Sequence, residues 1–171
     1  ADVLFGDFNP AGRLPFSVPR SVGQIPLYYN KKAPQSHDYV EMSASPLYPF
    51  GYGLSYTSFD YSDLHLSALT PRSFEVSFKV RNTGKYDGEE VAQLYLRDEY
   101  ASVVQPLKQL KHFARFYLKR GEEREVKFIL SEEDFSLVDR NLKSIVEPGT
   151  FQIMIGAASD DIRLQTKVEI K

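Results

Sequence analysis

Neighbouring acidic side chains are the first candidates for chemistry in this sequence. Asp38 and Glu41, or Asp160 and Asp161, could supply the paired carboxylic acid and carboxylate of general acid–base or nucleophilic catalysis. Asp160 and Asp161 stand in a Ser-Asp-Asp turn before an alternating run, so turn formation explains them. The run Glu132–Asp134 is typical of the start of a helical turn, where acids interact favourably with the helix dipole. We therefore expect Asp160, Asp161 and this run to be structural.

The sequence indicates neither a metal site nor a nucleotide site. His37, His65 and His112 lie far apart and the chain has no cysteine, so no histidine pair at helical spacing and no thiolate site is present. The run Gly51–Gly53 follows no strand and precedes no helix with a third glycine, unlike a dinucleotide-binding loop. We expect no metal and no cofactor.

Aromatic side chains are unusually frequent, with 11 Tyr and 12 Phe but no Trp. Tyr48, Phe50, Tyr52 and Tyr56 could stack on the C–H faces of sugar rings, or they could pack against a neighbouring domain. The glycines at 51 and 53 would permit the tight turns of a rigid strap over residues 46–57. We favour docking between domains for these four residues.

From about residue 59 the sequence alternates in the manner of β-strands. Phe74, Val76, Phe78 and Val80 share one face, and Val91–Leu96 is a nearly continuous apolar run, typical of a strand covered on both faces. Further short runs, separated by turn signals, lie at 59–66, 110–118, 126–130, 151–155 and 162–170. About seven short strands predict an all-β fold, an antiparallel sandwich. It should be fibronectin type III-like, because the Cys and Trp of antibody domains are missing.

Residues 1–58 follow a different pattern. Prolines at 10, 15, 19, 26, 34, 46 and 49 interrupt every candidate element. Ala1–Gly6 resembles the last turn of a helix closed by Gly6, and Arg13–Val18 a short edge strand. The segment has too little regular structure to form its own core, so we expect its aromatic side chains to pack against something else.

The composition argues against two classes of partner. With 21 basic and 23 acidic residues, the net charge of -2 gives no reason to expect nucleic acid or an anionic membrane. No apolar run approaches the roughly 20 residues that span a bilayer. No signal peptide is visible at the start of the chain.

Two groups of motifs are more specific than these patterns. The sequences at 6–16 (GDFNPAGRLPF) and 46–57 (PLYPFGYGLSYT) resemble the segment that joins the middle and last domains of family 3 β-glucosidases and β-xylosidases. Those at 82–84 (NTG), 87–91 (DGEEV), 93–95 (QLY), 106–111 (PLKQLK), 121–122 (GE) and 147–151 (EPGTF) resemble that family's C-terminal fibronectin type III-like domain. The resemblance covers essentially the whole chain, in the family's order.

This resemblance implies a division of the chain and a place for catalysis. Residues 1–58 would be the end of an α/β sandwich domain plus the strap, and residues 59–171 the fibronectin type III-like domain. In the family, an N-terminal barrel holds an aspartate nucleophile in a Ser-Asp-Trp context, and the α/β sandwich often supplies a glutamate acid/base. With no Trp here, the nucleophile motif cannot be present, and the resemblance assigns the acid/base glutamate to sandwich sequence upstream of residue 1. We therefore expect both catalytic carboxylates upstream and none in this chain.

Two further residue groups are judged in the light of the resemblance. The run Lys111–Phe113 matches a family barrel motif whose Lys and His bind sugar hydroxyls, but its surroundings are those of a strand of the accessory domain, so we expect a structural strand. The loop 37–42 could reach the mouth of the active site in an intact enzyme. Asp38 and Tyr39 are therefore candidate substrate contacts.

The sequence thus predicts a non-catalytic accessory region of a β-glucosidase-like family 3 glycoside hydrolase. It would brace the catalytic domains of a parent that hydrolyses terminal β-glycosidic bonds with retention. Its partners would be the upstream domains of the same polypeptide and, through the parent's active site, an oligosaccharide. A carbohydrate-binding module and a protein-interaction module are the alternatives. The resemblance also implies a periplasmic or secreted bacterial protein.

Overall fold

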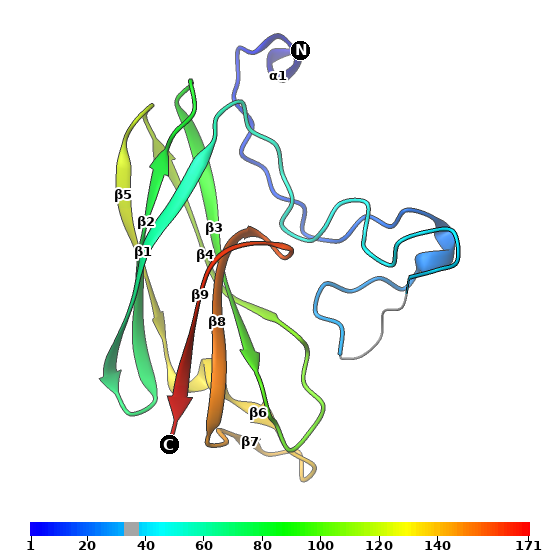
Figure 1. Ribbon diagram of the computed structural model, residues 1–171, viewed down its shortest axis with the longest axis vertical. Coiled ribbons are helices and arrows are strands. Elements are labelled where there is room, and N and C mark those ends of the chain that lie inside the picture. The colour runs from blue at the N-terminus through cyan, green and yellow to red at the C-terminus, as the bar shows by residue number, and fades with distance from the viewer. Residues whose placement is uncertain (33–37) are drawn as a thin grey trace.

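Two antiparallel sheets form the main body of the molecule (Figure 1). The computed structural model describes residues 1–32 and 38–171. One sheet has the order β1-β2-β5 and consists of β1 (Phe59–Thr70), β2 (Ser73–Asn82) and β5 (Glu123–Leu130). The other has the order β4-β3-β8-β9 and consists of β3 (Gly88–Asp98), β4 (Gln109–Leu118), β8 (Gly149–Ala158) and β9 (Asp161–Ile170). The predicted all-β sandwich of seven main strands is confirmed.

The hydrophobic core lies between the two sheets. Because side chains alternate along a strand, β2 turns Phe78 and Val80 inward while Ser77 and Lys79 lie on the opposite face. They meet Leu94 from β3 and Ile153 and Ile155 from β8, and none of these five side chains is more than 1% exposed. Burying a side chain of this size stabilises the fold by roughly 1.5–3 kcal/mol. The core therefore holds the two sheets face to face.

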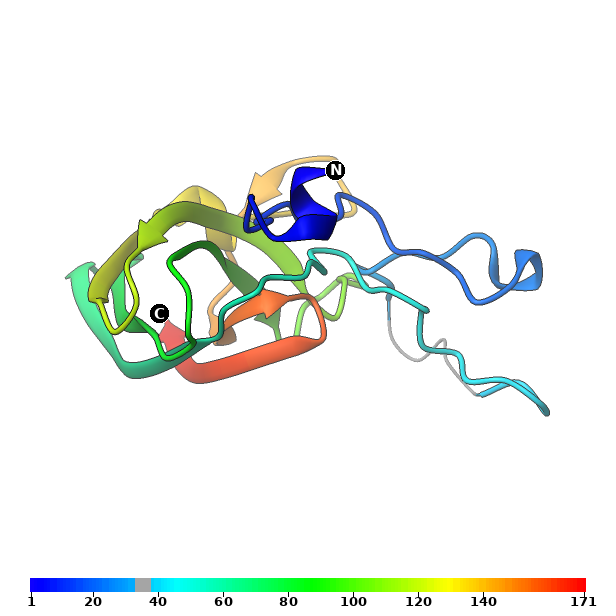
Figure 2. The ribbon, with the colours of Figure 1, turned by 90° about the horizontal axis from the view of Figure 1, so that it is seen from above.

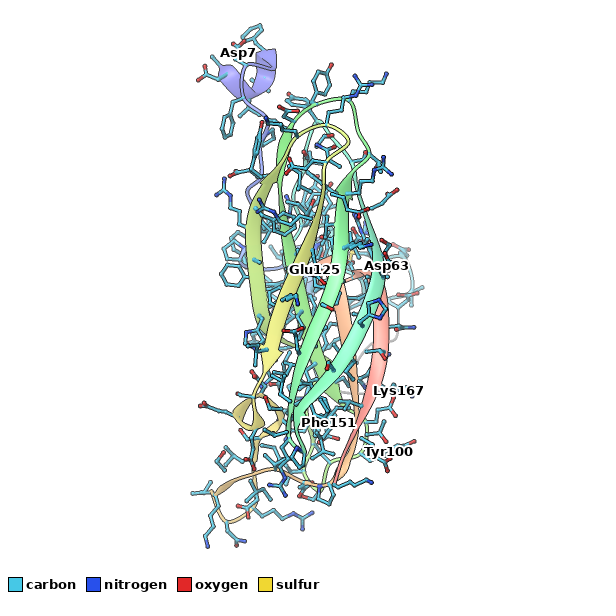
Figure 3. The ribbon with its side chains drawn as sticks, turned by 90° about the vertical axis from the view of Figure 1, so that its left-hand side faces the viewer. Asp7, Asp63, Tyr100, Glu125, Phe151 and Lys167 are labelled. Carbon is cyan, nitrogen blue, oxygen red and sulfur yellow. The ribbon has the colours of Figure 1, made fainter. Side chains whose placement is uncertain are left out.

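The outer face of the β1-β2-β5 sheet is polar (Figure 3). Asp63 pairs with Lys79 at 2.9 Å, and Lys127 pairs with Glu75 at 3.2 Å across neighbouring strands. Such exposed pairs add little stability, about 0–1 kcal/mol each. This face is that of a sheet open to solvent.

The connection after β5 contains the helical turn η2 (Glu132–Phe135). The backbone N–H of Ser131 donates to the Asp134 carboxylate at 2.8 Å, so the predicted capped turn at this point is confirmed. Phe135 is buried and lies edge-on against Phe151. The turn leads into a small hairpin, β6 (Leu137–Val138) and β7 (Ser144–Ile145), which the sequence patterns did not predict.

Residues 1–58, called here the proline-rich segment, leave the sandwich and project to one side (Figures 1 and 2). Among the described residues of this segment, regular structure is limited to α1 (Asp2–Phe5) and the single turn η1 (Val22–Gln24). Gly6 ends α1 in the left-handed conformation, with φ 89°, as predicted. Among the described residues, no helix is long and apolar enough to span a membrane.

The strand predicted at Arg13–Val18 is wrong. Val18 forms one isolated bridge with Tyr48, and its carbonyl also accepts the backbone N–H of Leu47. The other backbone bonds between residues 13–18 and the strap join Leu14 to residues 51 and 52. Prolines at 15, 19 and 49 remove backbone donors from both sides of the pairing, so a ladder cannot extend. The two stretches run together as irregular chain.

A docking site between the proline-rich segment and the sandwich

Gln93 on β3 joins the proline-rich segment to the sandwich. Its side-chain amide donates to the carbonyl of Ala157 at 2.6 Å and to the carbonyl of Gly51 at 3.4 Å, while its oxygen accepts the Tyr95 hydroxyl. Gln93 and Tyr95 point away from the core but are only 2% and 0% exposed. The prediction that this strand is covered on both faces is confirmed, and the segment supplies part of the second cover.

Gly51 lets the backbone approach Gln93 this closely. It has φ 83°, and a Cβ at this position would lie 2.3 Å from Oε1 of Gln93. Only glycine satisfies both conditions at low cost. The neighbouring carbonyl of Phe50 accepts the backbone N–H of Ser159 at 2.9 Å, which ties the strap to the turn between β8 and β9.

A row of aromatic rings runs from the strap to the sandwich. The rings of Phe50 and Tyr29 stack with centroids 4.1 Å apart, and Tyr29 meets Tyr95 edge-on at 6.2 Å. The Tyr29 hydroxyl accepts the backbone N–H of Leu110 at 3.3 Å. Aromatic pairs of this kind contribute about 0.5–1.5 kcal/mol beyond their buried area. Phe50 therefore faces the sandwich.

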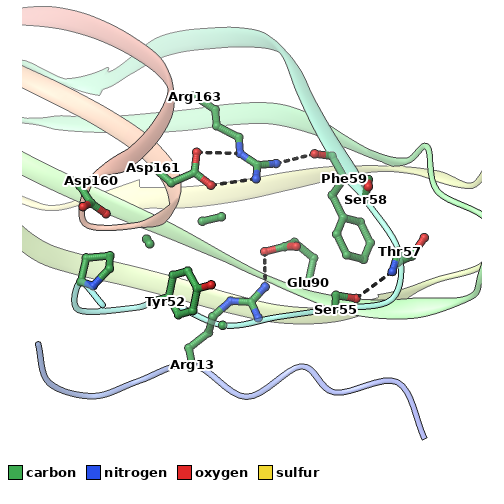
Figure 4. A pocket seen from close by; sticks show the side chains of 14 residues that line it. Arg13, Tyr52, Ser55, Thr57, Ser58, Phe59, Glu90, Asp160, Asp161 and Arg163 are labelled. Carbon is green, nitrogen blue, oxygen red and sulfur yellow. Dashed lines mark hydrogen bonds and ion pairs between the residues drawn. The ribbon is translucent and has the colours of Figure 1, made fainter. Parts of the chain in front are cut away.

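A buried ion pair forms a second contact (Figure 4). The Arg13 guanidinium lies 2.9 Å from the Glu90 carboxylate, and these side chains are 11% and 3% exposed. Glu90 also accepts the backbone N–H of Val91 at 3.0 Å. Nearby, burial, followed by the negative charge of Glu90, raises the pKa of the Tyr61 hydroxyl well above its ordinary value, so this group stays neutral.

Asn9 provides a third contact near α1. Its amide nitrogen donates to the carbonyl of Asp87 at 2.8 Å, and its oxygen accepts the backbone N–H of Tyr56 at 2.8 Å. Next to it, the Thr57 hydroxyl donates to the buried Asn82 side chain at 2.6 Å. These side chains fasten the end of the segment to the turn between β2 and β3.

The segment presents many apolar side chains to solvent. Fourteen of the twenty-three large, exposed apolar side chains among the described residues belong to residues 1–58, a third of the chain. The predicted docking residues Tyr48 and Tyr52 form a pair, with ring centroids 4.9 Å apart, and Tyr48 is 41% exposed. Tyr56 is 46% exposed, and its hydroxyl donates to the carbonyl of Val3. Of the four predicted residues, Phe50 is joined to the sandwich through its stack on Tyr29, and Tyr52 lies beside Glu90 and Ala157 of the sandwich.

The predicted substrate contacts lie on a separate, closed loop. The Asp38 carboxylate accepts the backbone N–H of Ala44 at 2.8 Å, and the backbone N–H of Tyr39 donates to the carbonyl of Met42 at 2.8 Å. Both side chains are exposed. No hydrogen bond or ring contact of the described residues joins them to the four docking residues. His37, which begins the predicted loop, lies outside the described residues.

Gln24 holds the base of this loop. It is 5% exposed, and its amide nitrogen donates to the carbonyls of Ser43 at 3.0 Å and Ser45 at 3.3 Å. Its oxygen accepts the backbone N–H of Arg20 at 2.6 Å. Sequence patterns did not single out Gln24, because one glutamine among polar and proline residues carries no signal of burial.

Of the acids judged structural from the sequence, Asp161 and the run Glu132–Asp134 have structural contacts, whereas the Asp160 side chain forms no hydrogen bond or ion pair with the described residues. Asp161 binds the Arg163 guanidinium with both oxygens, at 2.9 and 3.2 Å, beside the turn that contains Asp160. The run Glu132–Asp134 begins η2. No group of three or more potential metal ligands occurs among the described residues.

The Lys111–Phe113 run lies within β4, as the structural interpretation predicted. His112 lies 3.3 Å from the Asp134 carboxylate, and its ring stacks on Phe128 at 6.0 Å. Burial lowers the pKa of the Lys111 amine, and Phe113 is 67% exposed. These side chains point in different directions from one strand, which is the arrangement of a sheet and not of a converging binding site.

Comparison with known proteins shows which family this architecture resembles. Residues 1–56 match the family described as the glycosyl hydrolase family 3 C-terminal domain, and residues 90–159 match the fibronectin type III-like domain. A periplasmic β-glucosidase of Salmonella typhimurium is 45% identical over 95% of this chain and 23% of its own length. A β-xylosidase of Formosa agariphila is 45% identical over 95% of this chain and 24% of its own length.

Solved structures agree with these relatives. A β-glucosidase from Erythrobacter marinus superposes with a TM-score of 0.92 and 42% identity, over 99% of this chain and 23% of its own. A Listeria innocua β-glucosidase, solved with glucose, gives a TM-score of 0.87 and 36% identity, over 99% of this chain and 25% of its own. The chain thus spans about a quarter of the relatives it matches. It belongs to glycoside hydrolase family 3, of whose proteins it represents the C-terminal region with the fibronectin type III-like domain.

Proposed function

We propose that this chain is a non-catalytic accessory region that braces the catalytic domains of a β-glucosidase- or β-xylosidase-like enzyme. The parent would hydrolyse terminal β-glycosidic bonds with retention. The observation that carries the proposal is the concentration of exposed apolar side chains on residues 1–58, a segment anchored to the sandwich by buried polar contacts. Exposed apolar side chains gathered in one segment are typical of a docking face.

Two parts of the chain would have separate roles. Residues 59–171 supply a rigid sandwich, and residues 1–58 are the end of the α/β sandwich domain plus the strap. Tyr48, Tyr52 and Tyr56 would dock against the upstream domains, while Phe50 fixes the strap to the sandwich through Tyr29. Asp38 and Tyr39, on their exposed loop, would contact substrate at the mouth of the parent's active site.

A hydrolysis assay tests the absence of catalysis. The purified chain is expected to leave a chromogenic β-glucoside and a chromogenic β-xyloside intact, because both catalytic carboxylates would lie in the upstream domains. Turnover that disappears in Asp38→Asn or Asp160→Asn would overturn the proposal, since it would place a catalytic acid in this chain.

Variants of the intact parent test the bracing role. Tyr48→Ala should lower the thermal midpoint of the parent, because it removes an aromatic side chain from the docking face. Tyr100→Ala is the matched control: Tyr100 is 83% exposed on the loop between β3 and β4 and should have no effect. Equal midpoints for the two variants would contradict docking through Tyr48.

A periplasmic or secreted location is part of the same proposal. It is supported by the relative from Salmonella typhimurium, which is named as periplasmic. Fractionation of cells that express the parent checks it, and recovery of the parent with cytoplasmic markers would count against it.

A further inference from the structure

A cavity of about 490 Å³, with both polar and apolar walls, lies where the proline-rich segment meets the turn between β8 and β9 (Figure 4). Side chains from three parts of the molecule line it. Arg13 and Tyr52 come from the segment, Glu90 comes from β3, and Asp160 and Arg163 come from the turn and β9. Its volume lies within the range of about 300–1,000 Å³ that is usual for small-molecule sites.

Most charges around the cavity are already paired. Arg13 pairs with Glu90 at 2.9 Å, and Arg163 pairs with Asp161 at 2.9 Å. Asp160 has no ion-pair or hydrogen-bond partner within the described part of the chain, and Figure 4 shows its carboxylate at the cavity with no such contact. The cavity therefore offers one unpaired carboxylate beside two neutralised pairs.

The remaining lining combines hydroxyl groups with flat apolar surface. The hydroxyls of Tyr52 and Ser58 have no hydrogen-bond partner among the described residues. The Tyr52 ring borders the cavity and is held by its contact with the Tyr48 ring. Pro49 and Ala158 add apolar wall.

We infer that this cavity binds a neutral saccharide, a pyranose unit such as glucose or xylose. A carboxylate accepts two hydroxyl donors at once, and the Tyr52 and Ser58 hydroxyls can both donate and accept. An aromatic ring packs against the C–H face of a pyranose. A neutral ligand also fits the charges: the lining carries three carboxylates and two guanidiniums, and the Lys108 ammonium interacts with Asp160 from the edge of the cavity, so neither sign of charge predominates. This binding role goes beyond the bracing role proposed above.

Titration of the isotope-labelled chain with saccharides tests the inference by NMR. Glucose, xylose and cellobiose are added in turn, with sodium sulfate as the anionic probe. Saccharide binding should shift the backbone amides of Gly53, Ser58 and residues 158–161, and sulfate should not. Asp160→Asn should weaken binding about tenfold, the loss expected for a hydrogen bond to a charged group. Tyr52→Phe, which keeps the ring, should weaken it less.

Matched variants keep the test specific. Asp60 on the exposed start of β1 and Tyr100 on the loop after β3 lie outside the cavity lining. Asp60→Asn and Tyr100→Phe should therefore bind the saccharides as tightly as the unsubstituted chain. Three results would each overturn the inference. They are no shift with any saccharide, shifts that Asp160→Asn leaves unchanged, and shifts confined to a different pocket, the one lined by Tyr86 and Tyr117 near α1. The bracing role is measured by thermal midpoints of the parent, so a negative titration would leave it standing.

Discussion

At the scale of single residues, the Arg13–Glu90 pair is a buried ion pair of the docking site. Both side chains are largely buried, so neither charge can recover its hydration if its partner is lost. The Arg115–Glu89 pair joins β4 to β3 at the residue next to Glu90 but is exposed, with its side chains 54% and 34% accessible. The two pairs share one chemistry and differ in burial, which makes them a natural comparison.

Arg13→Ala should lower the free energy of unfolding by about 3–5 kcal/mol, because it leaves the Glu90 charge buried and uncompensated. Arg115→Ala should lower it by only about 0–1 kcal/mol. Urea denaturation of both variants measures the difference. Replacing both partners, in Arg13→Met with Glu90→Leu, should recover much of the loss. Similar losses for Arg13→Ala and Arg115→Ala would show that burial of the first pair does not matter.

Gly51 offers a second comparison between residues. Gly51 and Gly121 both have positive φ, 83° and 78°, but only at Gly51 would a Cβ meet the Gln93 side chain. Gly121→Ala should cost about 1–2 kcal/mol of backbone strain. Gly51→Ala should cost clearly more, because the Gln93 contact must also give way. Denaturation midpoints check the order of the two variants, and equal midpoints would mean that the Gln93 contact is dispensable.

At the scale of elements, strand alternation was a dependable guide and backbone pairing of proline-rich chain was not. The runs at 74–80 and 91–96 predict β2 and β3 because burial alternates or is continuous along them. The two-residue strands β6 and β7 are too short to show a period, and the pairing of 13–18 depends on partners about 30–40 residues away. Local pattern contains neither kind of information.

The candidate site shows the same limit. The aromatic positions of the strap are visible in the sequence, but their directions are not, since Phe50 faces the sandwich and Tyr48 faces solvent. The one available signal for the buried contacts was Gln93, a polar residue inside the apolar run 91–96. Its partners Gly51 and Ala157 are 42 and 64 residues away, and only the fold brings them together.

The turn between β2 and β3 responds to acid through Asp87. Its carboxylate accepts the backbone N–H of Arg120 and the Tyr117 hydroxyl, which hold the pKa of Asp87 below its ordinary value of 3.8. A lowered pKa contributes stability that is present above 3.8 and is lost as pH falls through the folded value. Asp87→Asn should therefore flatten the decline of stability below about pH 4, as measured by denaturation at stepped pH. Asp60→Asn is the control and should leave the dependence of stability on pH as it is in the unsubstituted chain. Identical curves of stability against pH for the two variants would contradict the role of Asp87.

At the scale of the whole molecule, one part has a core and the other does not. Every residue of the main hydrophobic cluster belongs to residues 59–171. Within the described part of residues 1–58, the buried residues are Ala11, Gln24, Gly51 and Thr57. Gly51 and Thr57 are bonded to the sandwich, and Gln24 holds a loop. The segment therefore depends on the sandwich for its shape.

Truncation tests this dependence and the proposed boundary at residue 58. A chain of residues 59–171 should remain folded, with a cooperative thermal transition at a midpoint lower by about 5 °C or more, since Gln93, Tyr95 and Glu90 become exposed. Residues 1–58 alone should show no cooperative transition. Circular dichroism follows both. A disordered 59–171 chain would mean that the segment is an integral part of the fold and that the boundary is misplaced.

The two termini have a practical consequence. Figure 1 shows α1 at one end of the long axis and Lys171 at the other, with the proline-rich segment projecting to the side. A biotin or affinity tag placed after Lys171 would attach the molecule to a sensor chip by the end opposite α1. The Tyr48 face and the cavity beside Asp160 would then both remain open to the flowing solution. One immobilised sample could report on soluble domains and dissolved sugars in successive injections.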